Sequence, residues 1–97
     1  MTFEFHPEAR IEFIEAISFY EESREGLGLR LSREVYATIK RITLGPNAWP
    51  RISENTRRCF TSRFPYGVVY EVREDDILVI AIAHSSREPF YWKDRLR

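Results

Sequence analysis

The chain has 97 residues, so residues 1–97 are predicted to form a single small domain. Its 15 basic and 15 acidic side chains give zero formal net charge, which argues against a strongly basic nucleic-acid coat protein. No segment approaches the roughly 18 apolar residues of a membrane span, and the N-terminus lacks the pattern of a signal peptide. The single cysteine, Cys59, excludes an internal disulfide framework and is expected to be buried. A cytoplasmic protein without a membrane partner is therefore expected.

The first half of the chain predicts a short strand followed by two helices. Phe3 and Phe5 alternate with polar residues, which is the period of a strand. A helix is predicted over about residues 7–24, with His6 as its capping residue, Pro7 in its first turn, and Glu8 and Glu12 near its positive N-terminal end. Its predicted buried stripe comprises Ala9, Phe13, Ala16, Ile17 and Tyr20, widened by Ile11 and Ile14.

The second predicted helix follows a glycine-containing turn, so the two helices should form an antiparallel hairpin. Leu31, Val35, Ile39 and Ile42 recur on one face of this second helix. Gly45, followed by Pro46, is expected to end it in a left-handed conformation. Residues 45–56 then read as a loop, in which Trp49 is expected to pack against the core.

The second half of the chain predicts three strands. The first is expected over residues 58–64, and the second contains the alternating residues 68–72. A polar turn at 74–76 has three consecutive acids but no further ligands at metal-binding spacing, so a hairpin turn is favoured over a metal site. Residues 77–83 are apolar throughout, which indicates a central strand buried on both faces. A short terminal helix is expected from about Phe90. The order β-α-α-β-β-β predicts an α+β fold with a small antiparallel sheet.

Arginines are concentrated in one part of the second half. Arg51, Arg57, Arg58 and Arg63 are accompanied only by Glu54 within residues 51–63. Guanidinium groups bind phosphate or carboxylate through two parallel hydrogen bonds. The same pattern also fits an exposed edge strand whose charges prevent association with other sheets. Both interpretations remain open from the sequence.

A second cluster follows the predicted central strand, where a rigid scaffold often presents functional side chains. It contains an imidazole (His84), a guanidinium (Arg87) and a phenol (Tyr91), followed by Trp92. From the chemistry of these residues alone, ordinary packing is the favoured interpretation: Phe90 and Trp92 would cover the sheet edge, and Arg87 would pair with an acid. No phosphate-binding loop, zinc-ligand spacing or nucleophile elbow is present in the sequence.

Three stretches together resemble the RelE/ParE superfamily of bacterial type II toxin–antitoxin toxins, and more closely its ParE-like members. They are residues 6–9 with 16–21 and 26–28, residues 57–58 with 63–72, and residues 80–84 with 87–92. This resemblance implies a helical hairpin packed on one face of the sheet. It also implies a toxin that a cognate antitoxin neutralises, in a hetero-oligomer, and that needs no cofactor or metal.

The resemblance leaves the target open between two classes. ParE-like members inhibit DNA gyrase by binding, whereas RelE-like members cleave mRNA on the ribosome. In the second case the catalytic candidates are Arg63, His84, Arg87 and Tyr91. Target-binding candidates are Arg57, Arg58 and Trp92. A third alternative is a non-toxic binding module of the same fold.

Two departures from the RelE-like pattern favour the gyrase-binding alternative. The arginine that RelE-like enzymes carry before the Val-Tyr strand is here Gly67, and their loop lysines are missing. The high aromatic content further predicts an apolar groove, on the helical hairpin or the sheet, that accepts an extended or helical antitoxin segment folding on binding.

Overall fold

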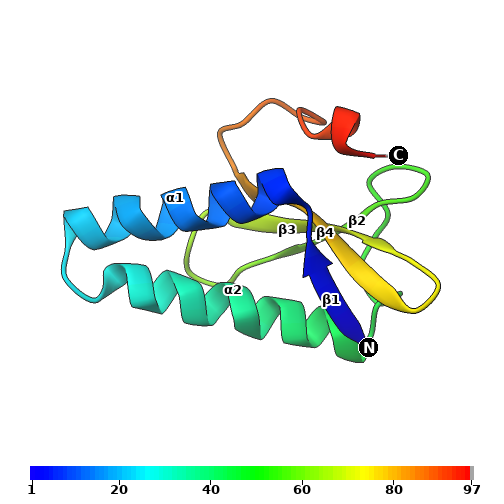
Figure 1. The fold of residues 1–97 in the computed structure, drawn as a ribbon, viewed down its shortest axis with the longest axis horizontal. Helices are drawn as coiled ribbons and strands as arrows, with labels where there is room; N and C mark the ends of the chain where they lie inside the picture. Colours follow the sequence, from blue (N-terminus) through cyan, green and yellow to red (C-terminus); the bar gives the residue numbers. More distant parts are fainter. Residues whose placement is uncertain (97) are drawn as a thin grey trace.

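The computed structural model describes residues 1–96, which form two helices packed on a four-stranded sheet (Figure 1). The elements in chain order are β1 (Thr2–Phe5), α1 (Pro7–Ser23), α2 (Leu27–Leu44), β2 (Arg57–Phe60), β3 (Tyr66–Val72), β4 (Asp76–His84) and a 3-10 turn, η1 (Lys93–Arg95). The predicted α+β element order is therefore confirmed. The described residues contain no helix long and apolar enough to cross a membrane.

The helical hairpin is fixed by local capping and by one close approach. His6 caps α1 as predicted, because its Nδ1 accepts a hydrogen bond of 3.0 Å from the Glu8 backbone N–H. The turn between the helices places Gly26 at φ +86°, a left-handed conformation that favours glycine. A Cβ on Gly28 would lie 2.6 Å from the Ile17 carbonyl oxygen, so only glycine lets α2 approach α1 this closely.

Two helix details differ from the sequence prediction. Gly45 ends α2 as expected, but at φ −146° rather than in the left-handed region; its N–H donates to the carbonyls of Arg41 and Ile42. Ile11 and Ile14 are 48% and 53% exposed, so they do not widen the buried stripe of α1. The buried residues of α1 face α2 and β4, the two elements with which this helix packs most extensively, and Ile11 and Ile14 point away from them.

The sheet has the strand order β1-β4-β3-β2 and is mixed rather than wholly antiparallel. β2, β3 and β4 form the predicted antiparallel meander, whereas β1 pairs in parallel with β4, from Thr2 opposite Asp76 to Phe5 opposite Val79. The meander leaves open edges only on β2 and β4, and β1 occupies the edge of β4. β4 is consequently the central strand, as predicted.

The loops shorten or shift several predicted elements. β2 ends at Phe60 rather than at 64, because the Thr61 hydroxyl donates to the carbonyls of Phe64 and Tyr66 and closes a tight turn. The polar turn before β4 is a hairpin turn, in which Arg73 forms two hydrogen bonds with the Asp76 carboxylate. The terminal helix is a single 3-10 turn that begins at Lys93 instead of Phe90.

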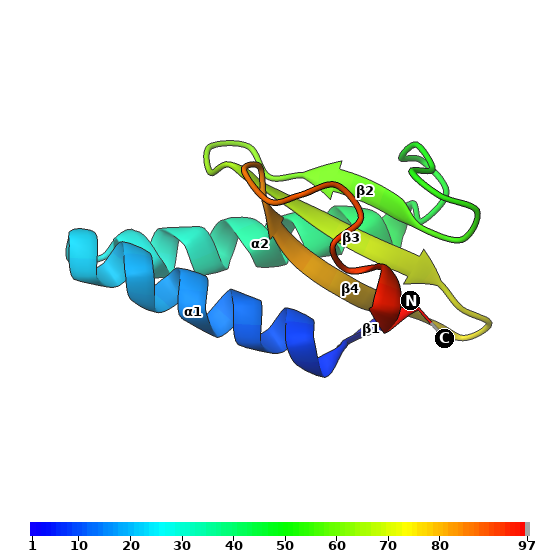
Figure 2. The same cartoon turned by 90° about the horizontal axis from the view of Figure 1, so that it is seen from above.

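Each face of the sheet carries its own hydrophobic cluster. The helix-side cluster joins both helices to the sheet and includes the buried Cys59, as predicted, with Trp49 packed against it. Burial raises the pKa of the Cys59 thiol. The opposite cluster consists of Val69, Ile80, Ala81 and the buried Trp92, so residues 85–96 cover the second face. In Figure 2 this C-terminal segment crosses over β4 and β3.

Candidate functional site

A cavity of about 590 Å³ lies between the sheet and the C-terminal segment. Five of the seven predicted site residues line it: Arg58, His84, Arg87, Tyr91 and Trp92. Arg58 projects from β2 and His84 from the end of β4, whereas the other three belong to the segment that folds back over the sheet. One arginine of the first cluster, Arg58, therefore lies at the same cavity as the second cluster.

Glu12 of α1 anchors the C-terminal segment beside this cavity. Its carboxylate accepts hydrogen bonds from the Tyr91 hydroxyl at 2.8 Å and from both terminal nitrogens of Arg95 at 3.0 and 2.8 Å. It also accepts the backbone N–H of Ile82 at 3.0 Å. The Glu12 and Arg95 side chains are only 14% and 13% exposed, so the pair is nearly buried. Such a pair holds the segment in one position.

Glu12 and Arg95 also contact the backbone of β4 at a β-bulge. The register between β3 and β4 shifts, with Val69 opposite Ala81 but Tyr70 opposite Val79, so Ile80 is an extra residue at a bulge. Arg95 donates to the Ile80 carbonyl at 3.0 Å, while Glu12 accepts the Ile82 N–H. Two backbone groups around the bulge therefore find side-chain partners, as buried polar groups require.

Tyr91 and Arg87 are held by neighbours as well as being close to each other. The Arg87 guanidinium lies 3.8 Å from the centre of the Tyr91 ring, and its Nη1 is 4.0 Å from a Glu12 carboxylate oxygen. Burial, followed by the hydrogen bond to Glu12, raises the pKa of the Tyr91 phenol well above its usual value. The phenol is therefore a neutral donor committed to Glu12, while Arg87, with its side chain 52% exposed, remains accessible.

His84 and Arg58 shape the mouth of the cavity. The His84 Nδ1 accepts the Ser86 backbone N–H at 3.0 Å, and its ring packs edge-on against Tyr66. Arg58 lies over Gly67, where an added Cβ would meet the Arg58 Cδ at 2.9 Å, and its guanidinium covers the Phe60 ring. The absence of a side chain at position 67 thus leaves room for the aliphatic part of the Arg58 side chain.

Two predicted site residues lie elsewhere. Arg63 is in the β2–β3 loop and lines a different cavity, next to α2, with its backbone N–H donating to Glu34. Arg57 donates to the carbonyls of Asn47 and Trp49 and so fixes the loop before β2. Trp92, although it lines the main cavity, is only 4% exposed. These contacts give Arg57 and Trp92 structural partners within the chain.

Sequence reasoning missed the two residues that organise the site, Glu12 and Arg95. The sequence predicts Glu12 only as an acid near the start of a helix, and no pattern in the polar tail distinguishes Arg95. The available signal was weak: Glu12 lies on the edge of the apolar stripe of α1, one residue before the buried Phe13. Within residues 1–96 no group of three or more His, Cys, Asp or Glu side chains is arranged to hold a metal ion.

Two helices packed on a four-stranded mixed sheet, with a C-terminal segment folded over the opposite face, make this chain a small α+β domain. The family model described as "ParE toxin of type II toxin-antitoxin system, parDE" matches residues 3–89, and the chain belongs to this family. It is therefore a toxin of the type II toxin–antitoxin class.

Comparison with solved structures agrees with this assignment at the level of the fold. A chain from the "Chromosomal ParDE TA system from P. aeruginosa" superposes with a TM-score of 0.76. The two share 17% sequence identity, and the match covers 87% of this chain and 95% of that one. No functionally curated protein is significantly similar in sequence.

Proposed function

We propose that this protein inhibits growth by binding DNA gyrase and that a cognate antitoxin neutralises it. The observation that carries the proposal is the division of the candidate ribonuclease residues. The Tyr91 hydroxyl is committed to Glu12, and Arg63 lines a separate cavity from His84 and Arg87. Metal-independent RNA cleavage needs a base, an acid and phosphate-binding cations around one phosphate. Binding of a protein target needs no such arrangement, and the Arg87 side chain is exposed to a partner.

One observation favours the ribosome-dependent endoribonuclease as the second candidate. Arg58, His84 and Arg87 line the same cavity, so two guanidinium groups and an imidazole face one space. Such a set is able to bind a phosphate and to move a proton. The two candidate functions predict different effects of removing the Arg87 side chain.

We expect Arg87→Ala to weaken gyrase inhibition through binding alone, because the toxin breaks no bond. Titration in a supercoiling assay should therefore give a higher half-inhibitory concentration but the same maximal inhibition. Arg10→Ala, an exposed arginine of α1 outside the cavity, serves as the control. Cleavage of mRNA on ribosomes by the wild type, lost by roughly 100-fold or more in Arg87→Ala at saturating concentration, would instead establish the ribonuclease. Absence of any growth defect without antitoxin would indicate the non-toxic module.

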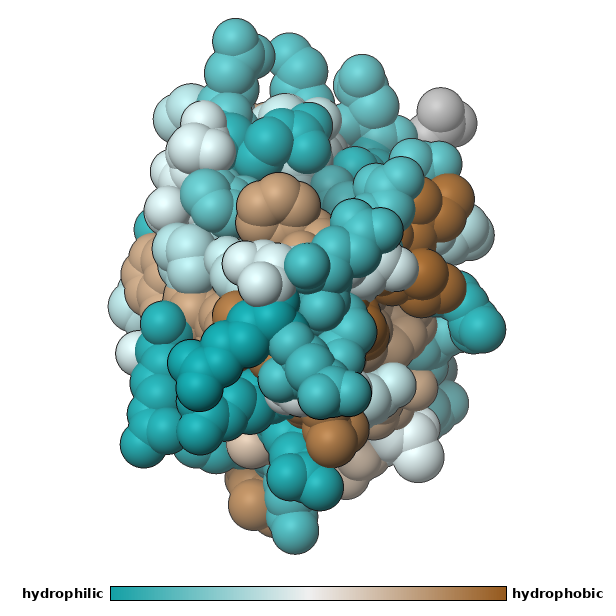
Figure 3. All heavy atoms as spheres, turned by 90° about the vertical axis from the view of Figure 1, so that its left-hand side faces the viewer, coloured by the Kyte–Doolittle hydropathy of each residue, from teal (hydrophilic) through white to brown (hydrophobic). Residues whose placement is uncertain are grey.

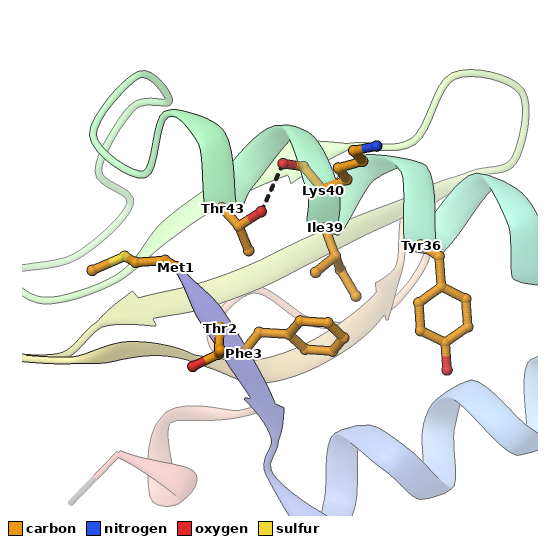
Figure 4. A pocket seen from close by; sticks show the side chains of 7 residues that line it. All are labelled: Met1, Thr2, Phe3, Tyr36, Ile39, Lys40 and Thr43. Atoms are coloured by element: carbon orange, nitrogen blue, oxygen red, sulfur yellow. Dashed lines mark hydrogen bonds between the residues drawn. The ribbon is translucent and has the colours of Figure 1, made fainter.

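The antitoxin is expected in a groove between β1 and α2, which Figure 4 shows from close by. The groove has a volume of about 450 Å³, and the exposed side chains of Met1, Phe3 and Tyr36 contribute to its lining. β1 is an edge strand, so its outer backbone groups have no neighbouring strand within the described chain. A peptide segment of the antitoxin would add a strand there and place apolar side chains in the groove.

We expect Tyr36→Glu to weaken antitoxin binding by at least about tenfold, because a carboxylate would then occupy an apolar contact surface. Leu44→Glu is the matched control, since Leu44 is 78% exposed on the same helix and does not line the groove. Calorimetry with the product of the adjacent gene measures the affinity, and circular dichroism checks that both variants fold. Equal affinity in the two variants would place the antitoxin elsewhere.

A further inference from the structure

The zero net charge of the chain conceals a separation of charge between its two helices. Helix α1 carries five acidic residues and one arginine, whereas α2 carries three arginines and a lysine against the single acid Glu34. Hydrophilic side chains dominate the end of the molecule that Figure 3 shows, with separate hydrophobic residues between them. An argument from net charge alone therefore misses a strongly basic surface along α2.

That basic surface surrounds a cavity of about 580 Å³ between α2 and the β2–β3 loop. Its lining includes four exposed arginines: Arg30, Arg33, Arg41 and Arg63. Within residues 1–96 none of these four guanidinium groups forms an ion pair with a carboxylate. The only acid in the lining, Glu34, accepts the backbone N–H groups of Arg63 and Phe64 and so holds the loop against the helix.

The spacing of these arginines suits a ligand with regularly repeated negative charge. Arg30 and Arg41 lie eleven positions apart on α2, about 16 Å along the helix axis at 1.5 Å per residue. One DNA strand advances about 3.4 Å per phosphate, so several phosphates fall within that length. Guanidinium groups bind phosphate oxygens through two parallel hydrogen bonds. A helix, whose backbone groups are already paired, gives an extended peptide no strand edge with which to bind.

We propose that the α2 cavity binds the phosphodiester backbone of duplex DNA without reading its base sequence. The guanidinium groups of Arg30, Arg33, Arg41 and Arg63 make the contacts, and α2 supplies a straight, rigid support for three of them. Contacts to phosphate fix position but carry no sequence information. This site is separate from the cavity at Arg87, and its occupancy does not depend on which target the toxin has.

The test is fluorescence anisotropy with a labelled DNA duplex of about 20 base pairs at about 50 mM salt, where phosphate contacts are strong. The triple variant Arg30→Ala, Arg33→Ala and Arg63→Ala should bind at least tenfold more weakly than the wild type. Arg10→Ala, Arg51→Ala and Lys93→Ala together form the charge-matched control, because all three residues are exposed and lie outside the cavity. This control should lose less than threefold.

Salt dependence provides a second readout that a general loss of charge would not reproduce. In a plot of the logarithm of the binding constant against the logarithm of the salt concentration, each phosphate contact adds about −0.9 to the slope. The slope of the triple variant should therefore be shallower than that of the wild type by roughly 2 to 3. The proposal is wrong if the wild type does not bind the duplex or if both triple variants lose affinity equally. It is also wrong if polyglutamate displaces the duplex at lower charge concentration than unlabelled duplex does.

Discussion

Ile80→Asp is expected to unfold the protein. Ile80 is fully buried in the cluster between the sheet and the C-terminal segment, at the bulge of the central strand. A carboxylate there would lose its hydration while the Arg95 guanidinium remains bound to Glu12. Burial of an uncompensated charge lowers the free energy of unfolding by about 4 kcal/mol or more. That is a large part of the roughly 5–15 kcal/mol by which a domain is stable.

The matched control for this substitution is Ile11→Asp, because Ile11 is 48% exposed on α1. Its free energy of unfolding should stay within about 0.5 kcal/mol of the wild type, as for other surface substitutions. Urea denaturation followed by circular dichroism compares the three proteins. A folded Ile80→Asp variant with wild-type stability would mean that the C-terminal segment does not exclude water from the second face.

The sequence predicted the elements well because local patterns determine them. Helical spacing in residues 7–24, the uninterrupted apolar run at 77–83 and the glycines between the helices each constrain their own segment. The parallel pairing of β1 was not predictable in this way. Thr2 and Asp76 are distant in the sequence, and the alternation of Phe3 and Phe5 is the same for a parallel or an antiparallel neighbour.

The candidate site was predicted only in part, because some of its contacts also join residues that are distant in the sequence. His84, Arg87 and Tyr91 are close in the sequence and remained close in the structure, and Arg58 joined them from a neighbouring strand. Their common partner, Glu12, is 70 or more residues away from every group that it accepts a hydrogen bond from. An acid in the second turn of a helix is consistent with the helix dipole, so nothing local signals a buried pair.

Removal of the Glu12 carboxylate should therefore have the second large effect on stability. In Glu12→Ala the Arg95 guanidinium would remain nearly buried without its acid, and the Tyr91 hydroxyl and Ile82 N–H would lose their acceptor. Loss of one partner from a buried ion pair costs about 3–5 kcal/mol. At about 4–8 °C per kcal/mol for a domain of this size, the melting temperature should fall by at least about 12 °C.

The same substitution should loosen the C-terminal segment before the rest of the domain, because Glu12 connects residues 82, 91 and 95 to α1. Limited trypsin digestion reports this directly: cleavage after Arg87, Lys93 and Arg95 should accelerate well below the melting temperature.

Glu15 is an exposed acid on the same helix and provides the control. Glu15→Ala should change the free energy of unfolding by no more than about 0.5 kcal/mol and should leave the rate of cleavage unchanged. Glu12→Gln keeps the shape of the side chain but loses its charge. Its stability and its rate of cleavage should therefore lie between those of Glu12→Ala and Glu15→Ala. If Glu12→Ala matched Glu15→Ala in both measurements, the segment would be held by its apolar contacts through Trp92 alone, and the ion pair at Glu12 would contribute no net stability.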